Sequence, residues 1–536
     1  MPSTFFGLEI GKRGIFAQQG ALQVTGHNIA NANTGGYSRQ RAEMVATPAI
    51  PYPSATNDRQ AGQLGTGVTV SSLQRLRERF LDIQFRDQNT NVGYYEKKTD
   101  TLEKIEVLLN EPSDKGFQYS MDQFWNSWQK VSSTPKDQAA RETLRQNAVA
   151  MTENFTFIHS SLVKTKNNLN DEVQVTAQEI DSYARQIASL NKQIGEVVPH
   201  GYQPNDLYDQ RDMLIDKLSK IVDISVTEVD NGMVNITLNA ASLGPTPGAN
   251  PQASPTTTIP LVTGKDQMYV HAIKDGNGMY QVRVTDTKDY ASTSKTKEYA
   301  AIHFTSGELG GLLESRGDFE YVKFNGTEWK KEVGTGTVDE FIGRMNSLAT
   351  EMFKAVNEVH KNGYNLDDLT NGTKESLAFF TTKSGKDTPD DASDFQVNPK
   401  IMESVRKIAI ASKQDSNNTD EPIPGEEDNR NALAIFALKH KDINFGTETT
   451  SFDGYTKGTI ANLGIQTREA QRMLDNTAML AGEVENRRQS VSGVSLDEEM
   501  SNMIKFQHAY SASARMITAV DEMLDKIING MGLVGR

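Results

Sequence analysis

An unbroken apolar repeat through residues 144–197 constrains this chain more than any other feature. Its positions step by alternating fours and threes, with one extra step of four after Leu169, which places them on one face of an α-helix. The members are Leu144, Ala148, Met151, Phe155, Ile158, Leu162, Thr165, Leu169, Val173, Thr176, Ile180, Tyr183, Ile187, Leu190, Ile194 and Val197. No proline or glycine interrupts the repeat before Gly195, so we expect a single helix about 80 Å long. Its apolar face must be covered along the whole run, which favours an elongated bundle of helices.

Helical segments on either side of this repeat supply its partners. Residues 92–109 and 117–131 have helical spacing, and Pro112 separates them. After the repeat, PHGYQPND is typical of a turn, in which Asn205 or Asp206 can cap the helical segment that follows to residue 222. We therefore expect residues 91–222 to form a long helical hairpin core.

The apolar period changes from 3.6 to 2 at Val222, which indicates β-structure. Asp230-Asn231-Gly232 lies between two alternating runs, and Asn-Gly in that position is typical of a type I′ hairpin turn. Strand-like runs continue to about residue 304, so we expect residues 223–336 to form a β-rich inserted domain.

Helical spacing returns at residues 337–363 and 455–492, which we expect to be core helices. The region between them, 364–454, is mixed and polar, and its stretch 412–430 is typical of a mobile acidic loop. At 536 residues the chain is too long for one core. The predicted fold class is therefore α+β and multidomain, with a helical bundle core built from both halves of the chain and terminal coiled-coil helices.

Both ends of the chain carry helices with two apolar rows each. Residues 1–90 are expected to hold an axial helix, an Asn/Gly turn and short strands, and residues 493–536 a second axial helix. In the N-terminal helix, one row contains Leu8, Ile15, Leu22 and Ile29, and the other contains Ile10, Ala17 and Val24. In the C-terminal helix, one row contains Met500, Met503, Tyr510, Ile517, Leu524 and Ile528, and the other contains Phe506, Met516, Met523 and Ile527. Two adjacent rows make a face too wide for one partner helix. We expect the ends to pair, to be disordered in the free subunit, and to fold fully when neighbouring copies cover the second row.

Composition and motifs argue against several classes of function. The chain has 70 acidic and 56 basic residues, a formal net charge of −14, so we expect neither nucleic acid nor a membrane as a partner. It has no cysteine, which excludes disulfides and thiolate metal sites. The eight histidines are scattered, the glycines of GQLGTGV at 62–68 do not match a nucleotide loop, and NLDDLTNG at 365–372 favours a turn over a calcium site. His27 and His508 are interpreted as packing or surface residues, and we expect no catalytic residue, metal or cofactor.

A stretch rich in asparagine and glycine follows the first helix. Asn28, Asn31 and Gly36 lie in GHNIANANTGGYSRQR, residues 26–41, and such residues tolerate the left-handed backbone that ends a helix. The stretch contains more asparagines and glycines than the cap of a single helix requires. We interpret it as a sharp turn that carries the chain from an inner helical layer to the next layer outward, with small side chains that let adjacent subunits approach.

This stretch resembles the signature of the flagellar rod, hook and hook-junction proteins. Asn28, Ile29, Ala30, Asn31, Thr34 and Gly36 match its core residue by residue. The sequence YSRQ, which begins at Tyr37, is similar to the corresponding sequence of the hook-junction members in particular. Residues 204–219, 306–316 and 492–529 also resemble those members.

The resemblance implies a structural protein that joins the flagellar hook to the filament. It would be secreted through the flagellar type III export apparatus without signal cleavage and would polymerise at the distal hook end, outside the cell. Implied partners are other copies of itself, the hook protein, a second hook-associated protein and an export chaperone on the C-terminal helix. The residues expected to act in assembly are Leu8, Ile15, Leu22, Asn28, Ile29, Asn31, Thr34, Gly36, Tyr37, Met500, Met503, Tyr510, Ile517, Leu524 and Ile528.

Two alternatives remain at the level of sequence. The chain could be another axial subunit of the hook or rod, although YSRQ and the long helical middle argue against it. The β-rich insert could instead carry a surface binding or enzymatic module, but it shows no cluster of polar and titratable residues typical of a site.

Overall fold

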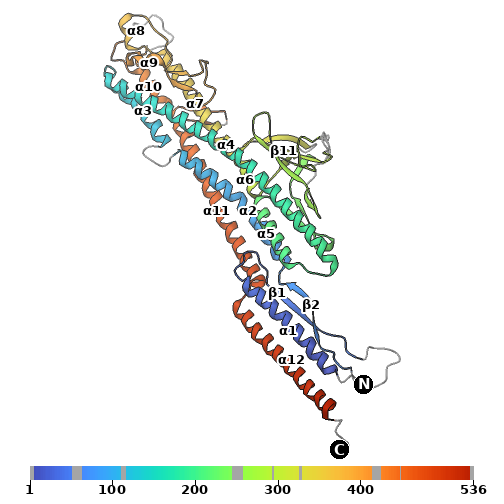
Figure 1. Cartoon of the computed structure of the whole chain (residues 1–536). Helices are drawn as coiled ribbons and strands as arrows, with labels where there is room; N and C mark the ends of the chain where they lie inside the picture. The colour runs from blue at the N-terminus through green and yellow to red at the C-terminus, as the bar shows by residue number, and fades with distance from the viewer. Residues whose placement is uncertain are drawn as a thin grey trace, which may run out of the picture.

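The computed structural model describes residues 5–50, 63–109, 116–243, 258–292, 295–324, 329–412, 424–446 and 448–530. It is elongated and mostly helical, and both ends of the chain lie at the same tip (Figure 1). The α+β multidomain class is confirmed. The acidic loop predicted at 412–430 falls mainly on residues 413–423, which lie outside the described residues.

Four long helices form the middle of the molecule. They are α2 (Arg79–Leu109), α4 (Gln138–Val197), α5 (Asn205–Ile221) and α11 (Phe452–Ser492). The predicted long helix is confirmed in α4, whose 60 residues span about 90 Å. Helix α5 folds back against α4, and α2 runs along α11 (Figure 1).

Two details of this helical middle differ from expectation. Helix α2 begins at Arg79 rather than near residue 92. Its first turns carry polar contacts that apolar spacing cannot reveal, such as Arg86 Nε donating to Asp216 Oδ1 at 2.7 Å. Asn205 does not cap α5: its Nδ2 donates to Gln40 Oε1 at 3.1 Å and to Leu73 O at 3.0 Å. It therefore connects α5 to the N-terminal strands.

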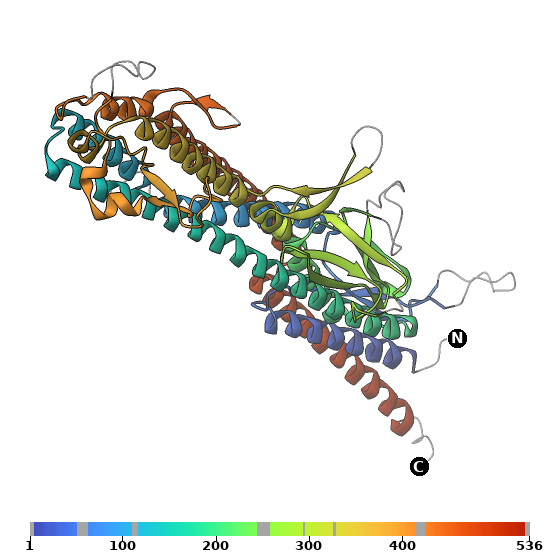
Figure 2. The ribbon, with the colours of Figure 1, turned by 90° about the horizontal axis from the view of Figure 1, so that it is seen from above.

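The strands between residues 224 and 334 gather on one side of the helical body (Figure 2). One sheet has the order β3-β4-β6-β7 and another β5-β10-β9-β8, and β11 pairs with β12. Their bounds are β3 Ile224–Glu228, β4 Val234–Leu238, β5 Ala241–Leu243, β6 Ile259–Thr263, β7 Asp266–Gln267, β8 Tyr269–Lys274, β9 Tyr280–Thr285, β10 Glu298–His303, β11 Phe319–Phe324 and β12 Trp329–Gly334. The hairpin predicted at Asn231 and Gly232 is present, with φ of 60° and 72°, but Val229 N–H bonds Met233 O, so its loop has three residues rather than two.

A helix, α6 (Gly307–Arg316), interrupts the region predicted to be β-rich. Its two central glycines disfavour a helix in isolation. In the fold they permit close packing on α2, since a Cβ built on Gly311 would lie 2.6 Å from Tyr94 O. Tertiary contact therefore overrides local preference here.

The end of the body far from the termini is built around aromatic side chains. Trp128 is fully buried, with its ring centroid 5.2 Å from that of Phe379. The elements here are α3 Phe117–Ser133, α7 Thr337–Asn362, α8 Leu366–Asn371, β13 Phe380–Thr382, β14 Phe395–Val397, α9 Pro399–Glu403, α10 Arg430–Ala437, β15 Ile443–Asn444 and β16 Thr449–Thr450. In the NLDDLTNG stretch, Asn365 and Asp368 form a capping box at the start of α8.

Candidate functional site

The terminal segment consists of α1 (Phe6–Ala30), α12 (Leu496–Gly530) and a ribbon of β1 (Gln40–Ala46) with β2 (Val68–Arg75). The helices from the two ends of the chain lie side by side, as expected (Figure 1). The ribbon packs on α1. Among the described residues, no helix is long and apolar enough to cross a membrane.

On α1, small residues rather than the predicted row of Leu8, Ile15, Leu22 and Ile29 form the centre of the contact with α12. The buried positions of α1 are Gly11, Gly14, Ala17, Ala21, Thr25 and Asn28. A Cβ built on Gly11 would lie 2.7 Å from Ile517 Cγ1, and one on Gly14 would lie 2.8 Å from Ser513 Oγ. The helices can approach this closely because these side chains are absent. The spacing of small residues was the signal that could have predicted this face.

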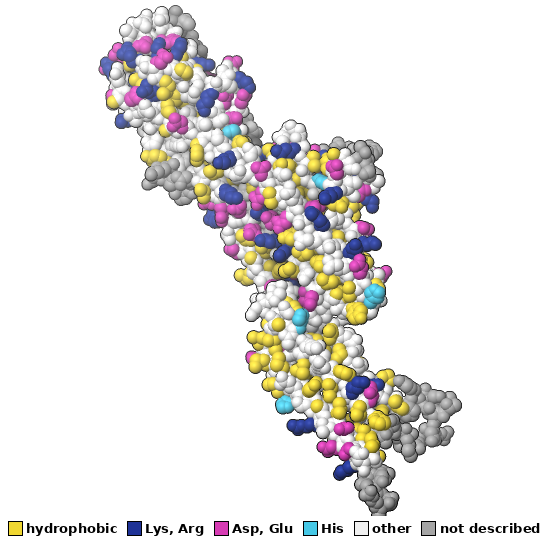
Figure 3. All heavy atoms as spheres, in the orientation of Figure 1, with side chains coloured by type: hydrophobic (Ala, Val, Ile, Leu, Met, Phe, Trp, Pro, Cys, Tyr) yellow, Lys and Arg dark blue, Asp and Glu magenta, His cyan; other side chains and the backbone are white. Residues whose placement is uncertain are grey.

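The predicted apolar rows are only partly covered within one copy of the chain. Leu8, Ile15, Leu22 and Ile29 are half-buried, as are Met503, Ile517 and Leu524 on α12. Exposed on α12 are Met500 (57%), Tyr510 (39%) and Ile528 (69%), together with Ile504, Met516, Met523 and Ile527. Apolar side chains accordingly gather over the terminal segment in Figure 3. A single copy of the chain leaves this apolar surface uncovered.

Asn28 joins α1, β1 and α12 at the end of the terminal segment that lies next to the body. The residue is 1% exposed and lies inside the last turn of α1. Its Nδ2 donates to Gln40 O at 2.8 Å and Glu499 Oε2 at 3.1 Å. Its Oδ1 accepts from Gln40 N–H at 3.0 Å and from the Tyr37 hydroxyl at 2.8 Å. One side-chain amide therefore holds the start of β1 and the first turn of α12 against α1.

The other signature residues shape the turn after α1. Asn31 Nδ2 donates to His27 O at 3.0 Å, which satisfies a carbonyl at the helix end, and Thr34 Oγ1 donates to Asn31 Oδ1 at 3.2 Å. Gly36 has a φ of +80°, and a Cβ built on it would lie 3.3 Å from Met213 Cβ on α5. The neighbour that Gly36 approaches within this chain is thus α5.

Residues 37–40 connect the terminal segment to the body. Arg39 N–H donates to Ser492 O, the last residue of α11, at 2.8 Å, and its guanidinium pairs with Glu498 and Glu499 on α12. Ser38 N–H donates to Asp209 Oδ2 on α5 at 2.9 Å. Burial, together with nearby carboxylates, raises the pKa of the Tyr37 hydroxyl well above its usual range, so Tyr37 remains a neutral donor to Asn28.

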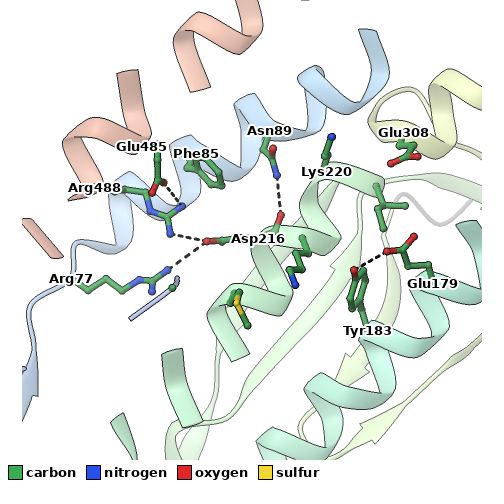
Figure 4. A pocket seen from close by; sticks show the side chains of 14 residues that line it. Arg77, Phe85, Asn89, Glu179, Tyr183, Asp216, Lys220, Glu308, Glu485 and Arg488 are labelled. Carbon is green, nitrogen blue, oxygen red and sulfur yellow. Dashed lines mark hydrogen bonds and ion pairs between the residues drawn. The ribbon is translucent and has the colours of Figure 1, made fainter. Parts of the chain in front are cut away.

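An arginine–aspartate cluster fastens the elements next to this connection. It comprises Arg75, Arg77, Arg86 and Arg488 with Asp82, Asp209, Asp212 and Asp216. Figure 4 shows Arg77 and Arg488 converging on Asp216 at the edge of a cavity of about 420 Å³. Sequence reasoning missed the cluster because its members come from β2, the β2–α2 connection, α2, α5 and α11 and follow no common period.

Asp212 is the acid of this cluster that faces the most arginines. Burial acts to raise its pKa, but the guanidinium groups of Arg77, Arg75, Arg86 and Arg211 outweigh burial and hold the pKa of Asp212 below its usual value. It therefore carries a negative charge at neutral pH, as the surrounding arginines require.

No group of three or more metal-ligating side chains occurs within the described residues. His27 is exposed and its Nδ1 lies 3.0 Å from the Tyr37 hydroxyl, while His508 is exposed on α12. The site that the structure does present is an apolar, multi-segment surface with a charged joint, which suits assembly with other protein.

Comparison with known proteins agrees with this surface. Residues 102–379 match the family model of the flagellar hook-associated protein FlgK helical domain, and residues 486–530 match that of the flagellar basal body rod FlgEFG protein C-terminal region. Flagellar hook-associated protein 1 of Bacillus subtilis (strain 168) is 37% identical over 545 residues, covering 100% of both chains. The protein of that name from Escherichia coli (strain K12) is 26% identical, covering 96% of this chain and 98% of its own.

A solved structure supports the fold. The flagellar hook junction protein FlgK from Burkholderia pseudomallei superposes with a TM-score of 0.55 at 15% identity, covering 76% of this chain and 100% of that chain. At this identity the likeness concerns the fold alone.

Proposed function

Since the chain belongs to the family of flagellar hook-associated protein 1 (FlgK), we propose that it is the structural protein that joins the flagellar hook to the filament. It polymerises at the distal end of the hook through α1 and α12. Its role is structural rather than enzymatic, and its place is in the flagellum outside the cell. The β-rich strands from 224 to 334 form an inserted domain that leaves the axial helices free to pack.

The uncovered apolar surface of α12 carries this proposal. Met500 and Ile528 are more than half exposed although they continue the apolar row of Met503, Ile517 and Leu524. Exposed contiguous apolar surface of this kind marks a protein–protein contact. Because α1 already occupies one side of α12, neighbouring copies would cover the other side.

Family membership and this surface support the following partners. In the flagellar axis, the hook protein lies below this protein and a second hook-associated protein lies above it. Before assembly, the flagellar type III apparatus exports the chain without signal cleavage, and an export chaperone shields the apolar rows of the C-terminal helix. Each of these partners would occupy surface that the isolated chain leaves open.

Deletion of the gene in its own cell tests the proposal. Cells without the protein should keep their hooks, lose their filaments and release unpolymerised flagellin into the medium, and the intact gene should reverse all three effects. Loss of hooks as well would favour a hook or rod subunit. Unchanged filaments and swimming would refute the assignment.

A further inference from the structure

A second cavity lies on the body side of the joint, between the β2–α2 connection, α5 and the hairpin of β3 and β4. Its volume is about 210 Å³, several times the ~30 Å³ that one water occupies in the liquid. Five arginines and three acids line it: Arg75, Arg77, Arg79, Arg86 and Arg211 with Asp82, Asp212 and Glu228. The lining therefore carries two more positive than negative charges.

Four of these arginines are largely buried, and their carboxylate partners are shared. Asp212 Oδ2 lies 2.9 Å from Arg75 Nη1 and 3.5 Å from Arg77 Nη1, and Asp212 Oδ1 lies 3.8 Å from Arg86 Nη2. One carboxylate thus serves three guanidinium groups, and each of them has a second partner: Asp209 for Arg75 at 2.9 Å, Asp82 for Arg77 at 2.7 Å and Asp216 for Arg86 at 2.7 Å. Arg79 pairs with Glu228 at the exposed rim, at 3.4 Å.

Among the residues that the structure describes, Arg211 makes no direct ion pair, although Asp212 lies near enough to interact with its charge. It is 4% exposed, and its Nη1 donates to neutral acceptors, Asn191 Oδ1 at 3.1 Å and Gly232 O at 2.7 Å. Over the part of the chain that the structure describes, no carboxylate pairs with it and its Nε has no acceptor. Burial lowers the pKa of Arg211, and the nearby Asp212 and Glu228 offset this effect only in part.

We propose that this cavity binds a small tetrahedral oxyanion, of which inorganic phosphate is the probe. Guanidinium groups suit such an ion because their planar N–H pairs match its oxygens. The ion would supply the direct negative partner that Arg211 lacks. It would also link Arg75, at the end of β2, and Arg77, in the β2–α2 connection, to Arg211 on α5, and so stiffen the joint between the terminal segment and the body.

Thermal unfolding of the purified full-length chain tests the proposal. Sodium phosphate should raise the unfolding temperature in a saturable way beyond sodium chloride of equal ionic strength, as expected for a ligand that binds the folded state. Arg79→Gln, at the exposed rim, should weaken the apparent affinity three- to tenfold. Glu228→Gln should strengthen it severalfold because it removes a rim carboxylate. Arg41→Gln is the matched control, since Arg41 is exposed on β1 and pairs with Glu43 outside the cavity, and it should change nothing.

Arg211→Gln should abolish the phosphate effect. If that variant does not fold, the opposite shifts of Arg79→Gln and Glu228→Gln still decide the matter. Equal stabilisation by phosphate and chloride, or a phosphate effect unaltered by both rim variants, would overturn the proposal. Equal stabilisation by sodium acetate would also overturn it, because the cavity would then accept a carboxylate rather than select a tetrahedral oxyanion.

Discussion

At the scale of single residues, Asn28 shows why the signature stretch contains an asparagine rather than another polar residue. Its amide donates two hydrogen bonds and accepts two, and all four are made. Aspartate could not donate, and it would face Glu499 as a second buried acid. Leaving buried partners unpaired costs roughly 1–3 kcal/mol per group, so this position requires both a donor and an acceptor.

Gly36 provides a residue-scale prediction. Gly36→Val forces a branched side chain into a φ of +80° and against Met213 Cβ, 3.3 Å from the added Cβ. We expect loss of filament attachment, while the unfolding transition of the 90–450 body stays unchanged. Motility assays and calorimetry of the purified chain measure the two effects.

Gly35→Val is the matched control for this substitution. Nothing lies within 4 Å of a Cβ built on Gly35, and the residue is exposed. Cells that carry Gly35→Val should keep their filaments attached. If Gly36→Val instead unfolded the body, the turn would belong to the folding core rather than to the assembly surface.

At the scale of elements, the close approach of α1 to α12 predicts a rescue. Gly11→Val places a side chain where Ile517 Cγ1 lies 2.7 Å from the added Cβ, so it should separate the helices and abolish motility. Combining it with Ile517→Ala should restore part of the motility, because the second change removes the obstructing atoms. If the motility defects of the two single variants simply add in the double variant, Gly11 and Ile517 do not meet in the assembled flagellum.

Helix α7 carries a second element-scale prediction, for pH. Its His360 is fully buried, and burial lowers its pKa to about 4. The neutral ring is held by Leu377 O, 2.7 Å from Nδ1, and by Ala409 N–H, 2.9 Å from Nε2. Above pH ~6.5 neither state binds a proton. As the pH falls towards 4, His360 binds a proton in the unfolded state but not in the folded state. The free energy of unfolding therefore decreases, by on the order of 3 kcal/mol at most.

Urea unfolding followed by tryptophan fluorescence can measure this decrease, because Trp128 lies beside His360, with ring centroids 6.4 Å apart. His360→Gln should flatten the dependence of the unfolding free energy on pH between 6.5 and 4. His200→Gln, at an exposed site, should leave that dependence as it is. Identical slopes in all three proteins would exclude His360 as the cause.

At the scale of the whole molecule, the terminal segment and the body differ in how well one copy covers their apolar side chains. Phe124, Leu144 and Phe155 in the body are fully buried, whereas Met500 and Met523 on α12 are 57% and 58% exposed. The body therefore contains a complete core, while the terminal segment leaves apolar surface uncovered in a single copy. Under the proposed function, the body would fold first and neighbouring copies would cover the terminal segment afterwards.

Limited proteolysis of the free subunit tests this contrast. Trypsin should cut early at Arg13, Arg515 and Lys526 and leave a resistant fragment that spans the body. In the polymer the same sites should be protected, because neighbouring copies supply the apolar contacts that offset the entropy of ordering the ends. Termini that resist trypsin in the monomer, with full helical circular dichroism, would contradict the prediction.

Features that depend on local periodicity could be predicted from the sequence. The apolar repeat of α4, the hairpin at Asn231 and the amphipathic rows of α1 and α12 all follow from residues a few positions apart. Burial of apolar side chains on one face selects helix or strand almost independently of the rest of the chain.

Contacts between distant segments required the tertiary structure. Asn28 reaches Glu499 and Arg39 reaches Glu498 across more than 450 residues of sequence, and Arg211 on α5 donates to Asn191 on α4. The small face of α1 and the glycine-rich helix α6 also depend on what lies opposite them. Polar bonds, close backbone approach and electrostatic balance depend on three-dimensional neighbours, and no spacing along one segment encodes them.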